Sequence, residues 1–282
     1  MMHLVAQKKE SIDMKRVNLM YFSPTTTTKT IVEAVGKRLV DTKGLERGNT
    51  IDFTLPKQRE SGQNFESNDI LLIGVPVYAG RVPNILLSYL NSIKGDNTIA
   101  IPTVLYGNRD YDDALLELND ILIKNGFNVI AGGAFIGEHS FSYTLGKERP
   151  DNKDLTIVRK FADKLYTKIG NNNHSAAKIN GNRPYRPYYK PKNDDDESVD
   201  IRRVIPKTDE TCIDCKICSE VCPVGSIPYN NVKAIVGICI KCGACIKLCP
   251  TQSKYFDDID YLRHKRELEE QFEERKEPEL FV

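Results

Sequence analysis

The sequence predicts an α/β protein in which a doubly wound parallel sheet is followed by a small cysteine-rich segment. Three observations lead to this fold class. Short apolar runs alternate with amphipathic helical segments from residue 17 to residue 169, polar segments with glycine or hydroxyl side chains follow several of the apolar runs, and all eight cysteines lie within residues 212–249. Strand–helix alternation of this length favours parallel strands joined by helices.

The first predicted strand is the apolar run VNLMYF at 17–22, and a helix is expected over 26–41. The apolar positions of that helix recur at helical spacing, at Ile31, Val32, Val35, Leu39 and Val40. The other expected strands are 50–53, 69–75, 99–106 and 128–136, and the other expected helices are 84–92, 110–125 and 153–169.

A run of hydroxyl side chains separates the first strand from the first helix. Free amides and the helix dipole both favour an anion such as phosphate at a helix N-terminus. A simple helix cap with polar neighbours is the alternative. The residues of this turn are Ser23, Pro24, Thr25, Thr26, Thr27 and Thr28.

Two further segments follow later strands and combine glycine with tyrosine. Glycine lets the backbone approach a flat ligand closely, tyrosine can stack on one, and ligands of such sheets bind at the carboxyl ends of the strands. The tyrosines can equally be packing residues. The candidate binding residues are Pro76, Val77, Tyr78, Ala79 and Gly80 in one segment and Tyr106, Gly107, Asn108, Arg109 and Tyr111 in the other.

Residues 16–170 resemble a flavodoxin. The phosphate loop of that family reads Ser/Thr-x-Thr-Gly-x-Thr, and residues 23–28 match it except at Thr26, where glycine is usual. The resemblance implies a five-stranded parallel sheet of order 2-1-3-4-5 and an FMN cofactor. The absence of a Gly-x-Gly-x-x-Gly pattern agrees with a mononucleotide rather than NAD.

All eight cysteines belong to one pattern written twice, Cys-x-x-Cys-x-x-Cys-x-x-x-Cys-Pro. The two copies are 27 residues apart (239 − 212). The pattern resembles the ligand run of bacterial two-cluster ferredoxins, in which the fourth cysteine of each copy ligates the other cluster. The resemblance implies two [4Fe–4S] clusters, cluster I held by Cys212, Cys215, Cys218 and Cys249, and cluster II held by Cys239, Cys242, Cys245 and Cys222.

Zinc binding and disulfide formation are two other uses of cysteine. Paired Cys-x-x-Cys spacings also bind zinc, although rarely with three cysteines at this spacing followed by Cys-Pro, twice. Disulfides are disfavoured because residues 1–15 show no apolar signal region, so that we expect a cytoplasmic protein with reduced thiols. No apolar run is long enough to span a bilayer.

The whole chain resembles flavodoxin–ferredoxin fusion proteins, and the segment 137–151 shares in that resemblance. This segment follows the last strand on the ligand side, where we expect it to form a lid or to meet the clusters. The expected organisation is a flavodoxin-like domain at 16–170, a linker at 171–206, a two-cluster α+β ferredoxin domain at 207–256, and a charged helix and tail at 257–282. We expect the basic, tyrosine-rich half of the linker to lie along the first domain. The C-terminal helix has a narrow apolar stripe at Ile259, Leu262, Leu268 and Phe272.

The predicted function is electron transfer between an FMN and two [4Fe–4S] clusters, with a redox protein as donor or acceptor and without a catalytic residue. The net charge of +1 argues against nucleic acid and membrane partners, and a homodimer stays open. Two alternatives also stay open. The first is a flavin-dependent oxidoreductase that reduces its own substrate or uses NAD(P)H at the flavin. The second is a ferredoxin carried on a flavin-free, flavodoxin-like scaffold.

Overall fold

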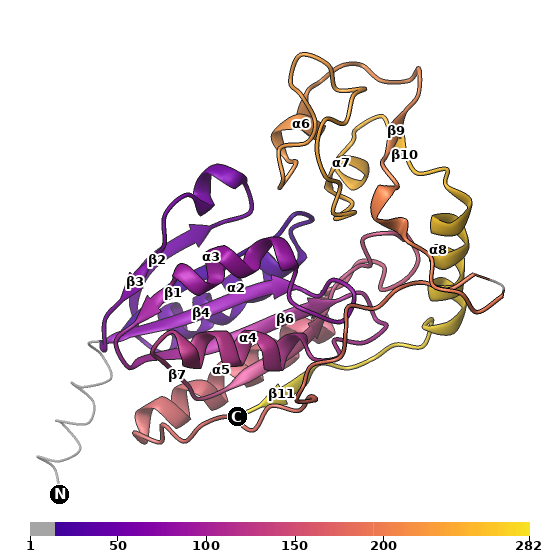
Figure 1. Ribbon diagram of the computed structural model, residues 1–282. Helices are drawn as coiled ribbons and strands as arrows, with labels where there is room; N and C mark the ends of the chain where they lie inside the picture. The colour runs from indigo at the N-terminus through magenta and orange to yellow at the C-terminus, as the bar shows by residue number, and fades with distance from the viewer. Residues whose placement is uncertain (1–14, 194) are drawn as a thin grey trace, which may run out of the picture.

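The computed structural model describes residues 15–193 and 195–282. The predicted absence of a signal region rests mostly on residues 1–14, which lie outside the described part. Figure 1 shows a sheet with helices on both faces, the cysteine-rich segment above one end of it, and a separate helix, α8 (Ile259–Gln271), at its side.

The central sheet is built on five parallel strand positions. Its path runs β2-β1-β4-β6-β8. This is the 2-1-3-4-5 order of flavodoxin-like doubly wound sheets. The strands are β1 (Arg16–Tyr21), β2 (Glu46–Asp52), β4 (Asp69–Pro76), β6 (Thr98–Tyr106) and β8 (Gly132–Ile136).

The prediction of five strands was wrong, because the sheet of the described residues has seven. The expected strand at 128–136 is two strands, β7 (Phe127–Val129) and β8, which both pair with β6 in parallel. The C-terminal β11 (Glu279–Phe281) then adds an antiparallel edge to β8. Three residues after a charged helix are too few to show a strand period, which is why the sequence pattern did not reveal β11.

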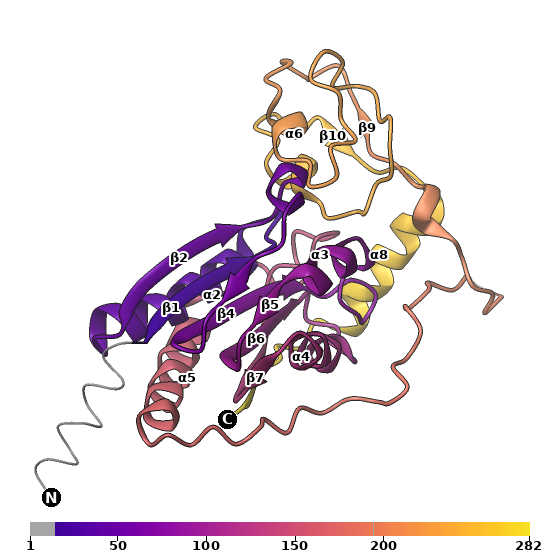
Figure 2. The ribbon, with the colours of Figure 1, turned by 60° about the vertical axis from the view of Figure 1, so that its left-hand side comes forward.

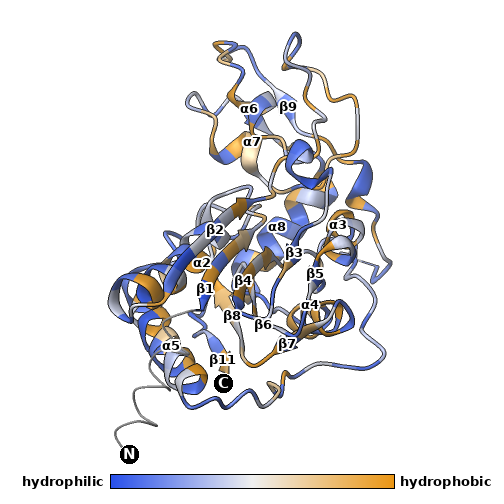
Figure 3. Cartoon of the chain, turned by 90° about the vertical axis from the view of Figure 1, so that its left-hand side faces the viewer, coloured by the Kyte–Doolittle hydropathy of each residue, from blue (hydrophilic) through white to orange (hydrophobic). Residues whose placement is uncertain are grey.

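Helices cover both faces of the sheet, and each face has its own apolar core. One core joins the sheet to α2 (Thr27–Lys37) and α5 (Asn152–Gly170), through residues such as Ile31 and Phe161. The other joins it to α3 (Leu87–Ser92) and α4 (Ala114–Lys124), through residues such as Leu90 and Leu118. In Figure 3 the hydrophobic colour gathers in the strands and the adjoining helix faces, whereas α8 is largely hydrophilic.

Short elements complete this domain. Helix α2 continues into a π-turn (Arg38–Thr42), and 3₁₀ turns lie at Pro56–Arg59 and Asn84–Leu86. The strands β3 (Asn64–Phe65) and β5 (Lys94–Gly95) form a small parallel pair. Helix α5 starts with a reciprocal capping box between Asp151 and Asp154, because each side chain bonds the other's backbone N–H.

Residues 207–256, here called the cysteine module, repeat their backbone as well as their sequence. Their short elements are β9 (Lys207–Thr208), α6 (Ile217–Glu220), α7 (Ala244–Lys247) and β10 (Lys254–Tyr255), with β9 and β10 antiparallel. Left-handed residues recur 27 positions apart, at Asp214 and Lys241, Lys216 and Gly243, and Gly225 and Gln252. The two copies therefore curl alike around their cysteines.

Two remaining segments connect these parts. Residues 171–206 run from the end of α5 along one side of the domain to the cysteine module, as Figure 2 shows, with one 3₁₀ turn at Ile201–Arg203. Helix α8 buries Tyr261, His264 and Leu268, while Ile259 and Leu262 are exposed. The predicted apolar stripe was thus wrong in part, because α8 packs through Tyr261 on the rings of Phe141 and Phe256.

Candidate functional site

A cavity of about 520 Å³ opens at the carboxyl ends of the parallel strands. Its walls come from six parts of the chain. They are the segments after β4 (Val77–Gly80) and β6 (Tyr106, Gly107, Arg109), the segment after β8 (His139–Phe141), the linker (Tyr188–Pro191, Val199–Arg202), and the cysteine module and α8 (Ile238–Lys241, His264, Leu268). The cavity therefore closes only when the module and the linker are in place.

The segment after β4 is a tight two-residue turn. Tyr78 and Arg81 exchange backbone hydrogen bonds of 3.0 and 3.1 Å, with Ala79 (φ 53°) and Gly80 (φ 78°) between them in left-handed conformations. The carbonyl of Gly80 accepts from the N–H of Asp113, and the carbonyl of Ala79 accepts from the N–H of Tyr189 at 2.9 Å. Helix α4 and the linker thus both hold this turn.

The residues of the segment after β6 either line the cavity or hold the C-terminal tail. Tyr106, Gly107 and Arg109 line the cavity. Asn108 is buried and donates to the carbonyls of Phe272 and Glu274 at 2.6 and 2.8 Å, and the Tyr111 hydroxyl donates to Glu279. Among the described contacts, the side chains of Asn108 and Tyr111 fasten the C-terminal tail rather than line the cavity.

The hydroxyl-rich turn after β1 lies outside the cavity walls but carries an unusual backbone. Thr26 has φ 68°, the left-handed conformation that a β-branched residue rarely adopts. Ser23 Oγ accepts from the Lys29 N–H at 3.0 Å, and the amides of Thr25, Thr27 and Thr28 donate to none of the described residues. The turn therefore presents free N–H groups at the start of α2.

This turn lies beside the strand end that leads into the cavity. A Cβ on Gly137 would meet Thr27 Cβ at 2.9 Å, so glycine permits the close approach. Two residues later the chain reaches His139, which lines the cavity. The turn and the cavity are therefore joined through the end of β8. Pro76 sits at the end of β4, next to the cavity-lining Val77.

Packed aromatic rings enclose the cavity on the side of α8. The ring of Tyr189 stacks on His264, Phe141 packs on Tyr261, and His139 packs edge-on against Phe141. Burial, with smaller contributions from His264, Lys247 and Arg109, lowers the pKa of His139 to about 3. His139 is therefore neutral at pH 7, and its Nδ1 accepts from the Phe141 N–H.

Two cations contribute to the same cavity. Arg109 pairs with Asp112 and lies over the ring of Tyr189, 5.1 Å from its centroid. Lys241 is 8% exposed, and its Nζ donates to the carbonyls of Arg202 and Cys239 at 2.9 and 3.0 Å. Burial lowers the pKa of Lys241, against the raising influence of Cys239 and Asp200.

The eight cysteines separate into two sets of four. Cys212, Cys215, Cys218 and Cys249 line one small cavity, and Cys222, Cys239, Cys242 and Cys245 line another. In each set, three cysteines come from one copy of the repeat and the fourth from the other copy. Within the described residues, no three His, Cys, Asp or Glu side chains form a ready-made site for a metal ion, so the thiols surround cavities rather than converge on one point.

The two sets differ in their surroundings. Cys215 is exposed, whereas Cys242 is buried and burial raises its pKa to about 12. Burial also acts to raise the pKa of Cys249, but hydrogen bonds from Ser253 and Thr251 outweigh it and lower that pKa to about 7. The Ser226 N–H donates to Cys222 Sγ at 3.3 Å. Sulfur atoms of both sets thus have hydrogen-bond donors beside them.

One cysteine belongs to two cavities. Cys239 lines the small cavity of its own set and also the large cavity at the strand ends. Tyr78 lines the large cavity from the other side, and the pKa of its hydroxyl is raised first by burial and then by Cys242 and Cys239. The two cavities therefore share a wall, which is formed by Ile238, Cys239, Ile240 and Lys241.

Direct contacts hold the cysteine module on the sheet domain. The Arg59 guanidinium donates to the carbonyl of Pro223 at 2.7 Å, and Lys247 pairs with Glu138. A Cβ on Gly243 would meet the carbonyl oxygen of Ser140 at 2.5 Å. The segment 137–151 thus contacts the cysteine module.

Several residues that line the cavity are not among the binding residues predicted from the sequence. Tyr188, Tyr189 and Lys190 belong to the linker, and His264 and Leu268 belong to α8. The basic-tyrosine half of the linker was predicted to lie along the first domain, and this is confirmed by its bonds to α4 and to the turn after β4. No periodic signal marks an extended segment as a cavity wall.

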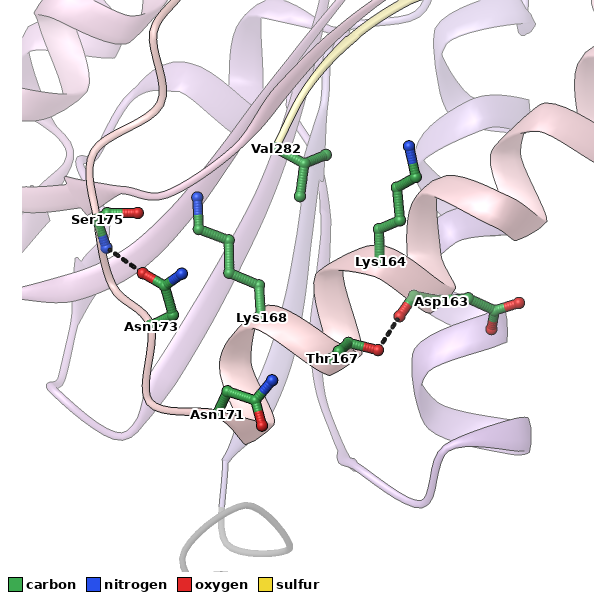
Figure 4. Close-up of a pocket in the computed structure, with 8 residues that line it drawn as sticks. All are labelled: Asp163, Lys164, Thr167, Lys168, Asn171, Asn173, Ser175 and Val282. Carbon is green, nitrogen blue, oxygen red and sulfur yellow. Dashed lines mark hydrogen bonds between the residues drawn. The ribbon is translucent and has the colours of Figure 1, made fainter.

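A second hollow, of about 510 Å³, lies at the other end of the domain (Figure 4). It is open and polar, and the Lys168 ammonium on its wall donates to the carbonyl of Ile130. It has no aromatic wall and no cysteine. Its lining consists of Asp163, Lys164, Thr167, Lys168, Asn171, Asn173, Ser175 and Val282.

Among the helices of the described residues, none combines the length and the apolar character needed to cross a membrane.

Comparisons with known proteins match the sheet domain alone. No protein-family model matches the chain, and no curated protein does. A flavodoxin from Streptococcus pneumoniae TIGR4 is 16% identical over 54% of this chain and 99% of its own, with a TM-score of 0.37. A Fusobacterium nucleatum flavodoxin bound to flavin mononucleotide is 17% identical over 56% and 99%, with a TM-score of 0.36. An archaeal flavodoxin is 13% identical over 55% and 98%, with a TM-score of 0.37. The flavodoxin-like strand order described above rests on this chain's own strand pairing.

Proposed function

We propose that this chain is an electron-transfer flavoprotein. FMN occupies the cavity at the strand ends, cluster I is held by Cys212, Cys215, Cys218 and Cys249, and cluster II is held by Cys239, Cys242, Cys245 and Cys222. The observation that carries the proposal is the position of Cys239, which lines both the large cavity and the small one. A ligand of cluster II would therefore border the flavin directly, within a single chain.

The large cavity suits a flavin in size and in character. Small-molecule sites usually enclose about 300–1,000 Å³ between mainly apolar walls with a few placed polar groups. This cavity has about 520 Å³, tyrosine walls at Tyr78 and Tyr106, and the cations Arg109 and Lys241. Its neighbouring turn offers the free amides of Thr25, Thr27 and Thr28 for a phosphate.

Thr26 also fits this assignment. It stands where the phosphate loop of flavodoxins has glycine, and its φ of 68° is one that glycine adopts without strain. A β-branched residue held in that conformation costs of order 1–3 kcal/mol, and such strain concentrates at ligand sites. The loop therefore keeps a glycine-like path although the side chain differs.

The cysteine module suits two cubane clusters. A cubane needs four thiolates around a volume rather than around a point, and each set of four cysteines lines its own cavity. Burial of Cys242 raises its thiol pKa to about 12, so a thiolate there needs a positive partner such as iron. Nearby N–H and hydroxyl groups at Cys222 and Cys249 supply the hydrogen bonds that tune cluster potentials.

The bound cofactors supply one- and two-electron exchange at the flavin and one-electron exchange at each cluster. The chain's own residues position them and exclude water. Tyr189 closes the cavity by bonding the turn at Ala79 and stacking on His264. Arg109 and Lys241 favour negative charge in the cavity. Cys215, a ligand of cluster I, is exposed, so we expect a redox protein to exchange electrons with the chain at cluster I.

The test is an anaerobic count of iron, sulfide and FMN per chain, followed by a stepwise reductive titration. About eight irons, eight sulfides and one FMN, with electrons passing between the centres, are expected. Eight irons without flavin uptake would show that the first domain is a flavin-free scaffold for the cysteine module. An iron count below eight would overturn the cluster assignment.

Two cysteine variants test the path. Cys239→Ser is expected to slow electron transfer between clusters and flavin, whereas Cys215→Ser, at the exposed end, is expected to slow exchange with an external donor while the flavin stays coupled to cluster II. Identical effects of both variants would contradict the proposed order. Steady NAD(P)H oxidation by the isolated protein would favour an oxidoreductase with its own substrate instead.

A further inference from the structure

Lys241 occupies the boundary between the flavin cavity and the cavity of cluster II. Lys241 lines both cavities and is 8% exposed. Two of its three N–H donors are used by the carbonyls of Arg202 and Cys239. In the part of the chain that the structure describes, no carboxylate lies within 4 Å of its ammonium, and the nearby Asp200 is engaged by Arg202. A buried cation without an ion pair acts strongly on its neighbours.

The same position in the other copy of the repeat carries the opposite charge. Asp214 lies 27 residues earlier (241 − 214) and has the same left-handed backbone, with φ 55° against 54°. Its side chain is 62% exposed and pairs with Lys216 at 2.6 Å. The equivalent of Lys216 in the second copy is Gly243, which carries no charge. Lys216 itself lines the cavity of cluster I and is 21% exposed, but its charge is compensated by Asp214. The two copies thus differ by a compensated pair near cluster I and an uncompensated buried cation near cluster II.

A second buried lysine does not cancel this difference. Lys254 lines the cavity of cluster I, and its Nζ donates to Thr208 and to the carbonyl of Val232. It acts electrostatically on Cys218 of one set and on Cys245 of the other. The positive charge of Lys254 therefore favours reduction of both clusters, whereas the positive charge of Lys241 lies beside cluster II and the flavin cavity and not beside cluster I.

We propose that Lys241 sets the direction of electron flow by raising the reduction potential of cluster II above that of cluster I. Net charge is among the factors that set iron–sulfur potentials. A fixed positive charge stabilises the reduced, more negative form of the centre beside it. One electron leaves reduced cluster I, which is oxidised, and enters cluster II, which is reduced; no proton moves. This inference rests on the proposed function, because it requires both clusters.

The experiment is a potentiometric titration of the full-length protein with dithionite, with the clusters followed by electron paramagnetic resonance. Lys241→Gln is expected to lower the potential of one cluster by at least 59 mV, a tenfold change for a one-electron couple, and to leave the other nearly unchanged. Lys241→Arg, which keeps the charge, is expected to stay close to the wild type. No shift in Lys241→Gln, or equal shifts of both clusters, would overturn the proposal.

Asp214→Asn is the matched control, because it changes charge by one unit at the equivalent exposed position. It is expected to shift either potential by less than Lys241→Gln does, since exposed charges are screened. If Lys241→Gln fails to fold, Asp214→Lys tests the same idea and is expected to raise the potential of cluster I; no rise would count against it. An iron count below eight in the wild type would instead contradict the proposed function itself.

Discussion

Arg186 of the linker is fastened to Asp113 at the start of α4. Its Nη2 lies 3.0 Å from Oδ1, and its backbone N–H donates to Oδ2 at 2.7 Å. The Asp113 side chain is fully buried. Burial acts to raise the pKa of this carboxyl, but the hydrogen bonds from Arg186 and Asn182 prevail and lower it. This pair holds the linker where Tyr188 and Tyr189 line the large cavity.

We expect Asp113→Ala to release the linker and to lower the free energy of unfolding by roughly 1–3 kcal/mol. The estimate is reduced because the Arg186 side chain is 51% exposed. Denaturant unfolding measures the loss, and limited proteolysis reports cleavage near residues 183–190. Arg183→Ala, which removes a more exposed pair with Asp120, serves as the control and is expected to cost less than about 1 kcal/mol. Equal losses in both variants would contradict this role of Asp113.

Gly80→Ala is expected to destabilise the turn after β4. The residue has φ 78°, and an added Cβ would meet Asp112 Oδ2 at 2.4 Å. Gly44→Ala is a matched control, because Gly44 has φ 76° and nothing within 4 Å of the added atom. Gly44→Ala should cost about 1 kcal/mol from the backbone alone, and Gly80→Ala 1–3 kcal/mol more, with weaker FMN binding. Thermal unfolding and flavin titration compare them, and equal losses would show that the clash is relieved.

Thr26→Gly is expected to relieve backbone strain in the hydroxyl-rich turn after β1. The left-handed conformation at φ 68° costs threonine about 1–3 kcal/mol, while glycine loses 0.5–1 kcal/mol more conformational entropy on folding. The net expectation is a gain of about 1 kcal/mol in the free energy of unfolding, without weaker FMN binding. Calorimetry with and without FMN measures both. A loss of stability would show that the threonine side chain itself holds the turn.

The stability of the protein should fall as the pH drops below about 6.5. Burial lowers the pKa of His139 in the folded protein to about 3, whereas the unfolded chain takes up this proton near pH 6.5. The contribution of neutral His139 is therefore complete above pH 6.5 and is lost as the pH falls toward 3, by up to about 1.4 kcal/mol per pH unit. Unfolding by urea at several pH values measures this slope.

His139→Asn should flatten that slope, because asparagine does not titrate. His174→Asn is the comparison, since burial also lowers the pKa of His174 but this residue lies outside the cavity. An unchanged slope in His139→Asn would assign the pH dependence to other groups, such as the carboxyl of Asp113.

The positions of most strands and helices and the repeat of the cysteines followed from local pattern, whereas the strand order and the division of the cysteines into two sets were implied by the resemblance to known families. Buried parallel strands read as continuous apolar runs, of which residues 69–75 are an example, and helices between them keep a 3.6-residue period. The cysteine spacing repeats every 27 residues, and the left-handed backbone repeats with it. Information of this kind lies within a few tens of residues and can be read along the chain.

Packing between distant segments decided the rest. The strand β11 pairs with β8 across more than 140 residues, and the linker tyrosines line the large cavity. Cys239 and Tyr78 line this cavity together, and Arg59 and Lys247 hold the cysteine module on the sheet. An extended linker and a three-residue strand carry no periodic signal, and the charge of Lys241 gains its effect from burial. The sequence alone thus determined which residues form each half of the site, whereas the tertiary structure decided how closely the halves meet, because that distance depends on side-chain contacts between segments far apart in the chain.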